Sequence, residues 1–233
     1  MSSFNAFTQK KKAGEGVVPV WLGVVSPRPV GGTLASAYCK PGLLVPAGTP
    51  ICFDEANKTI KPIIGFVVTA YSAAGSEDTY DEITIRPMVY GGVELLPTTS
   101  TYLMKLGATF ATQGKAGLVH SVTALTGDDA GKYKLEVAKS ANLGVLSAND
   151  ILVISTAVAA GTGKDMADQP NAYLYNDICI DALQNGESYE SINASGAAVD
   201  FHGEGLLIKR VPFGAELKAA LKAAIPNVVQ VGY

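Results

Sequence analysis

The sequence has few of the residues from which metal sites and disulfide frameworks are built. Its 233 residues include three cysteines and two histidines. The cysteines are Cys39, Cys52 and Cys179, an odd number with no two at CxxC spacing, so neither a disulfide framework nor a zinc site is predicted. We therefore expect free thiols in a reducing compartment and no cofactor.

Charge and long apolar runs are scarce as well. Charged residues make up 17% of the chain, below the roughly 25% typical of soluble domains, whereas 48% of the residues are hydrophobic. The formal net charge of −3 argues against a nucleic-acid-binding body. The longest aliphatic run, Ile151 to Ile154, is far shorter than the roughly 20 residues of a membrane helix, and no secretory signal is predicted. We expect no nucleic-acid or membrane contact, and an apolar surface partly covered by partner proteins.

Catalytic motifs are incomplete. The segment 161–165 resembles a phosphate loop, but Val158 occupies the position of its first glycine and Asp165 that of its magnesium-binding hydroxyl residue. His202 and Glu204 have the spacing of zinc deaminases without the second cysteine motif. A Gly-x-Ser-x-Gly elbow is absent, and the paired carboxylates of a glycosidase cannot be assigned from spacing. The chain is therefore not expected to be an enzyme.

The sequence does contain the patterns of strands and turns. Residues 43–53 and 144–154 each have an apolar run, a small or polar turn and a second apolar run. Pro46 favours a turn, and Gly48 and Asn149 accept a positive φ, so we interpret each unit as a β-hairpin.

Alternating hydrophobicity predicts further strands. Gly65 suggests a bulge in the strand expected at 59–70, and Ile83, Ile85 and Val89 are expected to share one face of the strand expected at 82–90. The strands at 119–125 and 132–138 are predicted to form the clearest hairpin, because turn residues join them, and Tyr133, Leu135 and Val137 are expected to share one face. These strands are expected at residues 59–70, 82–90, 119–125 and 132–138.

One helix is predicted at residues 216–225, where Leu217, Leu221 and Ile225 form an apolar stripe, and Pro226 ends it. We expect it to pack on a sheet containing Val199, Phe201 and Leu207. The expected fold class is mainly β, with one or two antiparallel β domains, sandwich or barrel-like, and this C-terminal helix. The expected division is a flexible N-terminal arm at 1–16, an N-terminal β domain at 17–95, a central β segment at 96–160 and a C-terminal β segment with the helix at 161–233.

Two segments are candidate binding sites. Lys10, Lys11 and Lys12, against a single Glu15, give residues 1–16 a charge of +2. This arm either binds an acidic patch on a partner or is simply a solvated end. The second segment is an acidic loop, for which a solvated state is expected over a cation site. Its acidic residues are Glu77, Asp78, Asp81 and Glu82. The nearby Tyr71, Tyr80 and Tyr90 fit either an interface or ordinary sheet packing.

Three stretches together resemble a known family. They are the lysine block followed by Gly14-Glu-Gly-Val-Val-Pro-Val20, the unit Leu44-Val-Pro-Ala-Gly-Thr-Pro50 followed by Ile64-Gly-Phe66, and the C-terminal blocks 197–208 and 221–231. This pattern is similar to the head-fibre or auxiliary capsid (decoration) proteins of tailed gut phages of the crAss-like type. The matched blocks cover about a third of the chain.

The resemblance implies a structural virion protein on the outer surface of a phage capsid, made in the bacterial cytoplasm. The implied partners are the major capsid protein and other copies of this chain, with a homotrimer favoured by capsid three-fold symmetry. Two alternatives stay open: a phage tail or baseplate β module, and a glycan-binding adhesion protein.

Overall fold

A computed structural model describes most of the chain between Trp21 and Val231. The described residues are 21–23, 26–27, 32–107, 109–110, 114–139, 143–159, 161, 163–175, 177–180, 193–194, 201–207, 211 and 214–231. The arm with Lys10, Lys11 and Lys12 lies outside them, as does Val199.

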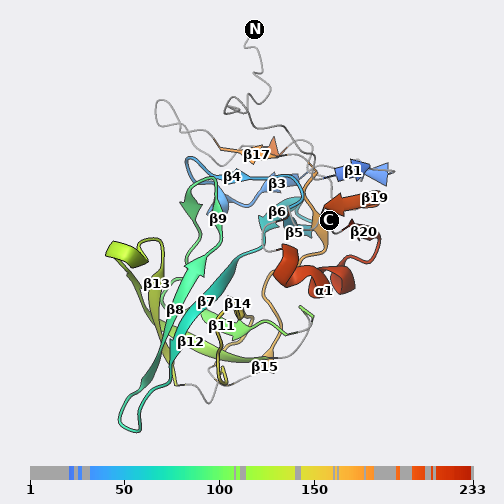
Figure 1. Ribbon diagram of the computed structural model, residues 1–233. Helices are drawn as coiled ribbons and strands as arrows, with labels where there is room; N and C mark the ends of the chain where they lie inside the picture. The colour runs from blue at the N-terminus through green and yellow to red at the C-terminus, as the bar shows by residue number, and fades with distance from the viewer. Residues whose placement is uncertain are drawn as a thin grey trace.

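A closed six-stranded antiparallel barrel forms the larger part of the fold (Figure 1). Its strands, in chain order, are β7 (Gly65–Ser72), β8 (Tyr80–Pro87), β11 (Tyr102–Lys105), β12 (Gly114–Ala124), β13 (Tyr133–Ala138) and β14 (Ile151–Ile154). Around the ring the order is β7-β8-β13-β12-β11-β14, and β14 pairs with β7 to close it. Strands β11 to β13 form a meander, and β14 returns beside β11, which is a Greek key. The mainly β, barrel-like prediction is confirmed, and strands from both sides of residue 95 share this barrel.

The barrel interior is filled by alternate residues of every strand. Ile83 and Ile85 on β8 face Leu135 and Val137 on β13, and all four are fully buried. The residues between them point outward, as the period of two requires. Tyr133, Leu135 and Val137 were expected on one face, and the hairpin β12–β13 confirms the predicted pairing.

A second layer packs on one outer side of the barrel. It is a five-stranded sheet in the order β16-β5-β6-β3-β18, with β3 and β6 parallel. Met104 of β11 and Val153 of β14 point out of the barrel into the core shared with this sheet. The strands here are β3 (Gly32–Leu34), β5 (Pro50–Asp54), β6 (Thr59–Pro62), β16 (Ala172–Tyr173) and β18 (Asn193–Ala194). Smaller pairs join β4 (Leu44–Val45) to β17 (Ile178–Cys179) and β9 (Val89–Tyr90) to β10 (Val93–Glu94). Short 3-10 helices span Ser36–Tyr38 and Gly127–Asp129, and β15 (Gly163–Lys164) pairs with β12.

The C-terminal residues form a separate small sheet with the one α-helix of the described residues. Strand β19 (Phe201–Leu207) pairs with β1 (Trp21–Gly23), with β2 (Ser26–Pro27) and, in parallel, with β20 (Val228–Val231). Helix α1 (Gly214–Ala224) begins two residues before the predicted start and ends one residue before the predicted end. Leu217, Leu221 and Ile225 are buried in the core together with Leu206 and Val228 from this sheet. The predicted stripe is thus a core face. Among the described residues no helix is both long and apolar enough to cross a membrane.

Three local predictions were wrong. The two apolar runs of each turn unit do not form a hairpin. In the first unit, β4 pairs with β17, whereas β5 pairs with β6 and β16. In the second unit, residues 144–147 form no strand, and β14 pairs with β11 and β7. The turns themselves are present, since Gly48 has φ 79° and Asn149 has φ 71°. Gly65 begins β7 rather than bulging within a strand, because the strand predicted at 59–70 is broken after Pro62. Val89 is 52% exposed, because the break between β8 and β9 at Met88 reverses the alternation.

Candidate functional site

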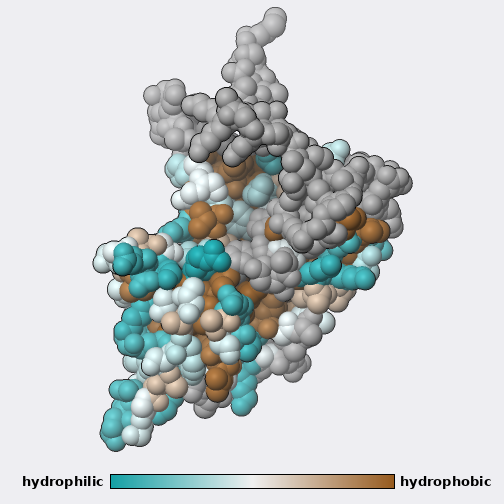
Figure 2. Space-filling view, viewed as in Figure 1, coloured by the Kyte–Doolittle hydropathy of each residue, from teal (hydrophilic) through white to brown (hydrophobic). Residues whose placement is uncertain are grey.

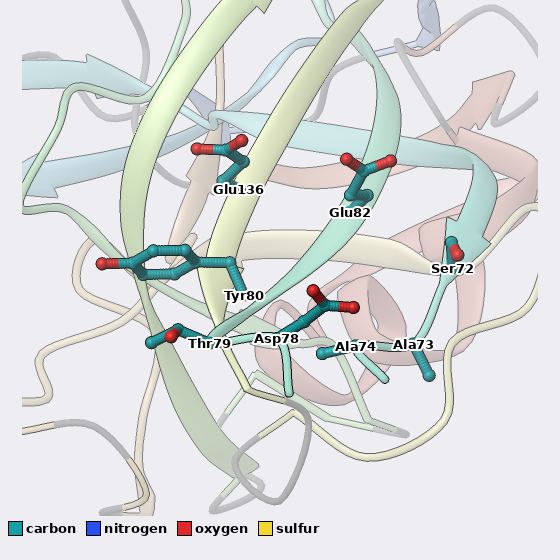
Figure 3. A pocket seen from close by; sticks show the side chains of 8 residues that line it. All are labelled: Ser72, Ala73, Ala74, Asp78, Thr79, Tyr80, Glu82 and Glu136. Carbon is teal, nitrogen blue, oxygen red and sulfur yellow. The ribbon is translucent and has the colours of Figure 1, made fainter. Parts of the chain in front are cut away.

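A polar pocket of about 350 Å³ lies on the outer face of the barrel, at the loop end of the β7–β8 hairpin (Figure 3). Strands β7, β8 and β13 supply its upper part and the hairpin loop its lower part. The lining residues are Ser72, Ala73, Ala74, Asp78, Thr79, Tyr80, Glu82 and Glu136. None of them is a lysine or arginine, so an anionic ligand is disfavoured.

Strand pairing brings two carboxylates of this pocket together. Glu82 on β8 is the direct cross-strand partner of Glu136 on β13, and both side chains rise from the same face of the sheet. Like charges directly opposite one another destabilise a sheet. Two neighbours offset this cost: the Lys134 ammonium pairs with Glu82, and the Ser121 hydroxyl donates to Glu136 over 2.8 Å.

An aromatic ring borders the carboxylates. Tyr80 stacks on His120 of β12, with ring centroids 4.3 Å apart and an angle of 12° between the rings. His120 is therefore an exposed residue on the outer surface of the sheet. Tyr71 and Tyr90 were the other two tyrosines considered for an interface. Tyr90 is buried, and its hydroxyl donates to the Ile63 carbonyl over 2.8 Å. Tyr71 packs against the barrel core. Burial raises the pKa of Tyr90.

The hairpin loop is fixed by two aspartates with different environments. Asp81 points into the barrel, where it is fully buried and accepts a hydrogen bond from the Ala74 N–H over 2.8 Å. Its second oxygen, Oδ2, has no partner among the described residues. Asp78 is exposed and accepts from the Gly75 N–H over 3.0 Å. The four predicted acidic residues therefore do not converge: Asp78 and Glu82 line the pocket, Asp81 turns inward and Glu77 stays in solvent.

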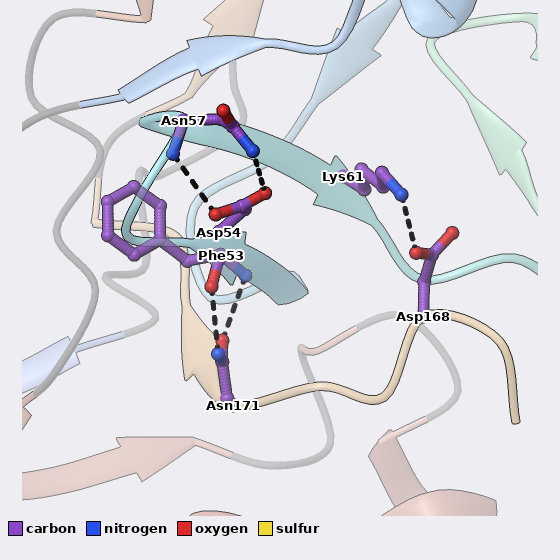
Figure 4. Close-up of polar contacts among 6 residues, drawn as sticks. All are labelled: Phe53, Asp54, Asn57, Lys61, Asp168 and Asn171. Carbon is purple, nitrogen blue, oxygen red and sulfur yellow. Dashed lines mark hydrogen bonds and ion pairs between the residues drawn. The ribbon is translucent and has the colours of Figure 1, made fainter. Parts of the chain in front are cut away.

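A second polar cluster, on the five-stranded sheet, has a structural role (Figure 4). The Asn171 side chain donates to the Phe53 carbonyl and accepts from its N–H, both over 2.9 Å, so it continues the ladder of β5. The Lys61 ammonium bonds to Asp168 over 2.7 Å, which raises the pKa of Lys61. These contacts tie residues 168–171 to the sheet.

The thiols near this cluster are not suited to nucleophilic chemistry. Burial raises the pKa of both Cys39 and Cys52, which are free. Burial, followed by the Asp168 charge, raises the pKa of the adjacent Tyr38 to about 12. Within the described ranges, no group of three or more histidine, cysteine or acidic side chains is placed to hold a metal ion.

The pocket is therefore the best candidate for a binding site. Alternation along β8 and β13 already predicts that Glu82 and Glu136 point outward, but their juxtaposition depends on the pairing of β8 with β13. Glu82 and Glu136 lie on the outer face of the sheet, and each has one protein partner, Lys134 for Glu82 and Ser121 for Glu136. This arrangement is suited to holding a polar ligand by hydrogen bonds. No protein-family model matches the chain, and neither a curated protein nor a solved structure shows significant similarity to it.

Proposed function

We propose that this chain is a structural virion protein on the outer surface of a tailed-phage head, where it binds the major capsid protein as a head fibre or its base. The observation that carries the proposal is the ordered set of three sequence stretches that resemble such proteins. The fold is compatible with it, because β1, directly after the first stretch, pairs with β19 inside the third. Segments from the two ends of the chain thus form one small sheet.

The surface chemistry supports a partner-covered protein. Val145 and Val158 are 80% and 82% exposed, on a chain with few charges. We propose that copies of the chain associate, with a trimer preferred because it matches capsid three-fold axes. Hydrophilic residues nevertheless cover much of the barrel at the lower left of Figure 2. This solvated part is the natural outward face of a bound protein.

The N-terminal lysines are the proposed contact with the capsid. Changing Lys10, Lys11 and Lys12 together to serine should weaken binding to shells of the major capsid protein more at low salt than at high salt, because salt screens exposed charges. Co-sedimentation with the shells measures this binding.

A matched control removes three positive charges elsewhere. Lys40, Lys218 and Lys222 are all exposed, and their serine variants should leave the binding and its salt dependence unchanged. Equal binding at both salt concentrations, with and without the arm lysines, would mean that the arm is only a solvated end.

The pocket favours one of the alternatives as a second candidate, a glycan-binding adhesion protein. Its facing carboxylates, Glu82 and Glu136, can accept hydrogen bonds from hydroxyl groups such as those of a sugar. This candidate and the capsid role are compatible, since a protein bound to a capsid by one face can bind a glycan with another.

A further inference from the structure

We propose that Asp81 is a positioning residue, which holds the loop of the β7–β8 hairpin in place although its burial destabilises the barrel. The loop spans residues 73–79 and forms the lower part of the polar pocket (Figure 3). The inference goes beyond the capsid role and does not depend on it.

The first argument is the cost of burying this carboxylate. Thr49, Asp81 and Ser155 are the buried polar or charged residues in the described part of the chain. The Thr49 hydroxyl donates to the Pro46 carbonyl over 2.6 Å, and the Ser155 hydroxyl accepts from the Ala157 N–H over 3.1 Å. Of the three, Asp81 is the one whose side chain keeps an oxygen, Oδ2, without a partner among the described residues. A buried carboxylate with a single protein hydrogen bond lowers stability relative to an apolar residue that fills the same space.

The second argument is the place of Asp81 in the barrel. It is in phase with Ile83 and Ile85, and it lies directly opposite Val137 on β13. These three residues are fully buried, so the alternation along β8 would be continued by an apolar residue at position 81. Aspartate is also disfavoured in strands. Neither core packing nor strand propensity therefore accounts for Asp81.

The third argument is the contact that the carboxylate makes. Its Oδ1 accepts the hydrogen bond of the Ala74 N–H over 2.8 Å, which joins the barrel interior to the start of the loop. Lys139, just after β13, holds the outer side of the loop. Its ammonium bonds to the Gly75 carbonyl over 3.0 Å and its N–H to the Thr79 carbonyl over 3.2 Å. The bond to Asp81 is charge-assisted and shielded from water, so it contributes more to holding the loop than an exposed one.

The experiment compares global stability with the exchange of one backbone amide in the full chain. In Asp81→Val, hydrogen exchange followed by NMR should show the Ala74 N–H exchanging about tenfold faster than in the parent, because its acceptor is gone. The urea unfolding midpoint of the same variant should rise, because a β-branched apolar residue replaces a buried carboxylate. Asp81→Asn keeps an oxygen acceptor, so its Ala74 exchange should stay closer to that of the parent.

Asp78→Ala is the matched control, because Asp78 is exposed and accepts from the Gly75 N–H over 3.0 Å. It should speed the exchange of Gly75 and leave both the Ala74 exchange and the unfolding midpoint unchanged.

Two results would overturn the inference. A lower unfolding midpoint in Asp81→Val, or its failure to fold, would mean that the carboxylate stabilises the barrel. An unchanged Ala74 exchange rate in folded Asp81→Val would mean that other contacts hold the loop. Because both readouts use the purified chain alone, they are distinguishable from a failure to bind capsid shells.

Discussion

Replacing Leu221 with alanine should lower the free energy of unfolding by about 2–5 kcal/mol. Leu221 is fully buried on α1 and belongs to the core that includes Leu206 of β19 and Val228 of β20. Truncation removes contacts from a site held by a helix on one side and strands on the other, so collapse of the cavity is restricted. Urea unfolding followed by far-ultraviolet circular dichroism measures the change.

Lys222→Ala is the matched control, because Lys222 is exposed on the same helix and alanine favours the helix. Its unfolding midpoint should stay close to that of the parent. Light scattering on the same samples should give three times the chain mass of 24.1 kDa for all three proteins. A parent that is monomeric at micromolar concentration would contradict the proposed oligomer. An unchanged unfolding midpoint with reduced assembly in Leu221→Ala would mean that this face is a subunit contact instead of core.

Replacing Gly117 with alanine should destabilise the barrel by about 1–3 kcal/mol, because overpacking forces neighbouring groups to move. Gly117 lies on β12 and points into the barrel. An added Cβ would lie 2.5 Å from Cγ1 of Val137 and 2.9 Å from Cδ1 of Leu143. Val137 is fully buried on the adjacent strand β13, so it has little room to yield. Thermal unfolding, read against chemical denaturation, measures the loss.

Gly114→Ala tests whether the cause is the contact or the loss of glycine. Gly114 is on the same strand, but its added Cβ would meet nothing closer than the Lys105 carbonyl oxygen at 3.4 Å. This variant should be close to neutral or slightly stabilising, since alanine restricts the unfolded chain. Equal destabilisation by the two substitutions would contradict the packing argument.

Local patterns in the sequence predicted the elements better than their partners. The alternation at Tyr133, Leu135 and Val137 and the turn before it define the β12–β13 hairpin, because both strands and the loop are continuous in the chain. The positive φ values of Gly48 and Asn149 also follow from residue type. Closure of the barrel does not follow from residue type, since β14 pairs with β7 and the six strands β8 to β13 lie between them in the sequence. No local pattern encodes such a pairing.

The candidate site also depends on a strand pairing that no local pattern encodes. Single-strand alternation indicates that Glu82 points away from Ile83, and that Glu136 points away from Leu135. It does not indicate that the two glutamates are neighbours, because four strands, β9 to β12, lie between β8 and β13 in the sequence. Asp81 shows the opposite case: it was grouped with the acidic loop, but its position in phase with Ile83 places it inside the barrel.

Co-sedimentation of the purified full chain with shells assembled from the major capsid protein of the same phage tests the central proposal most directly. We expect the chain to pellet with the shells and to saturate at a fixed ratio of chain to capsid subunit. A chain that stays in the supernatant with the shells, but pellets with tail tubes or baseplates of that phage, would contradict the head-surface role.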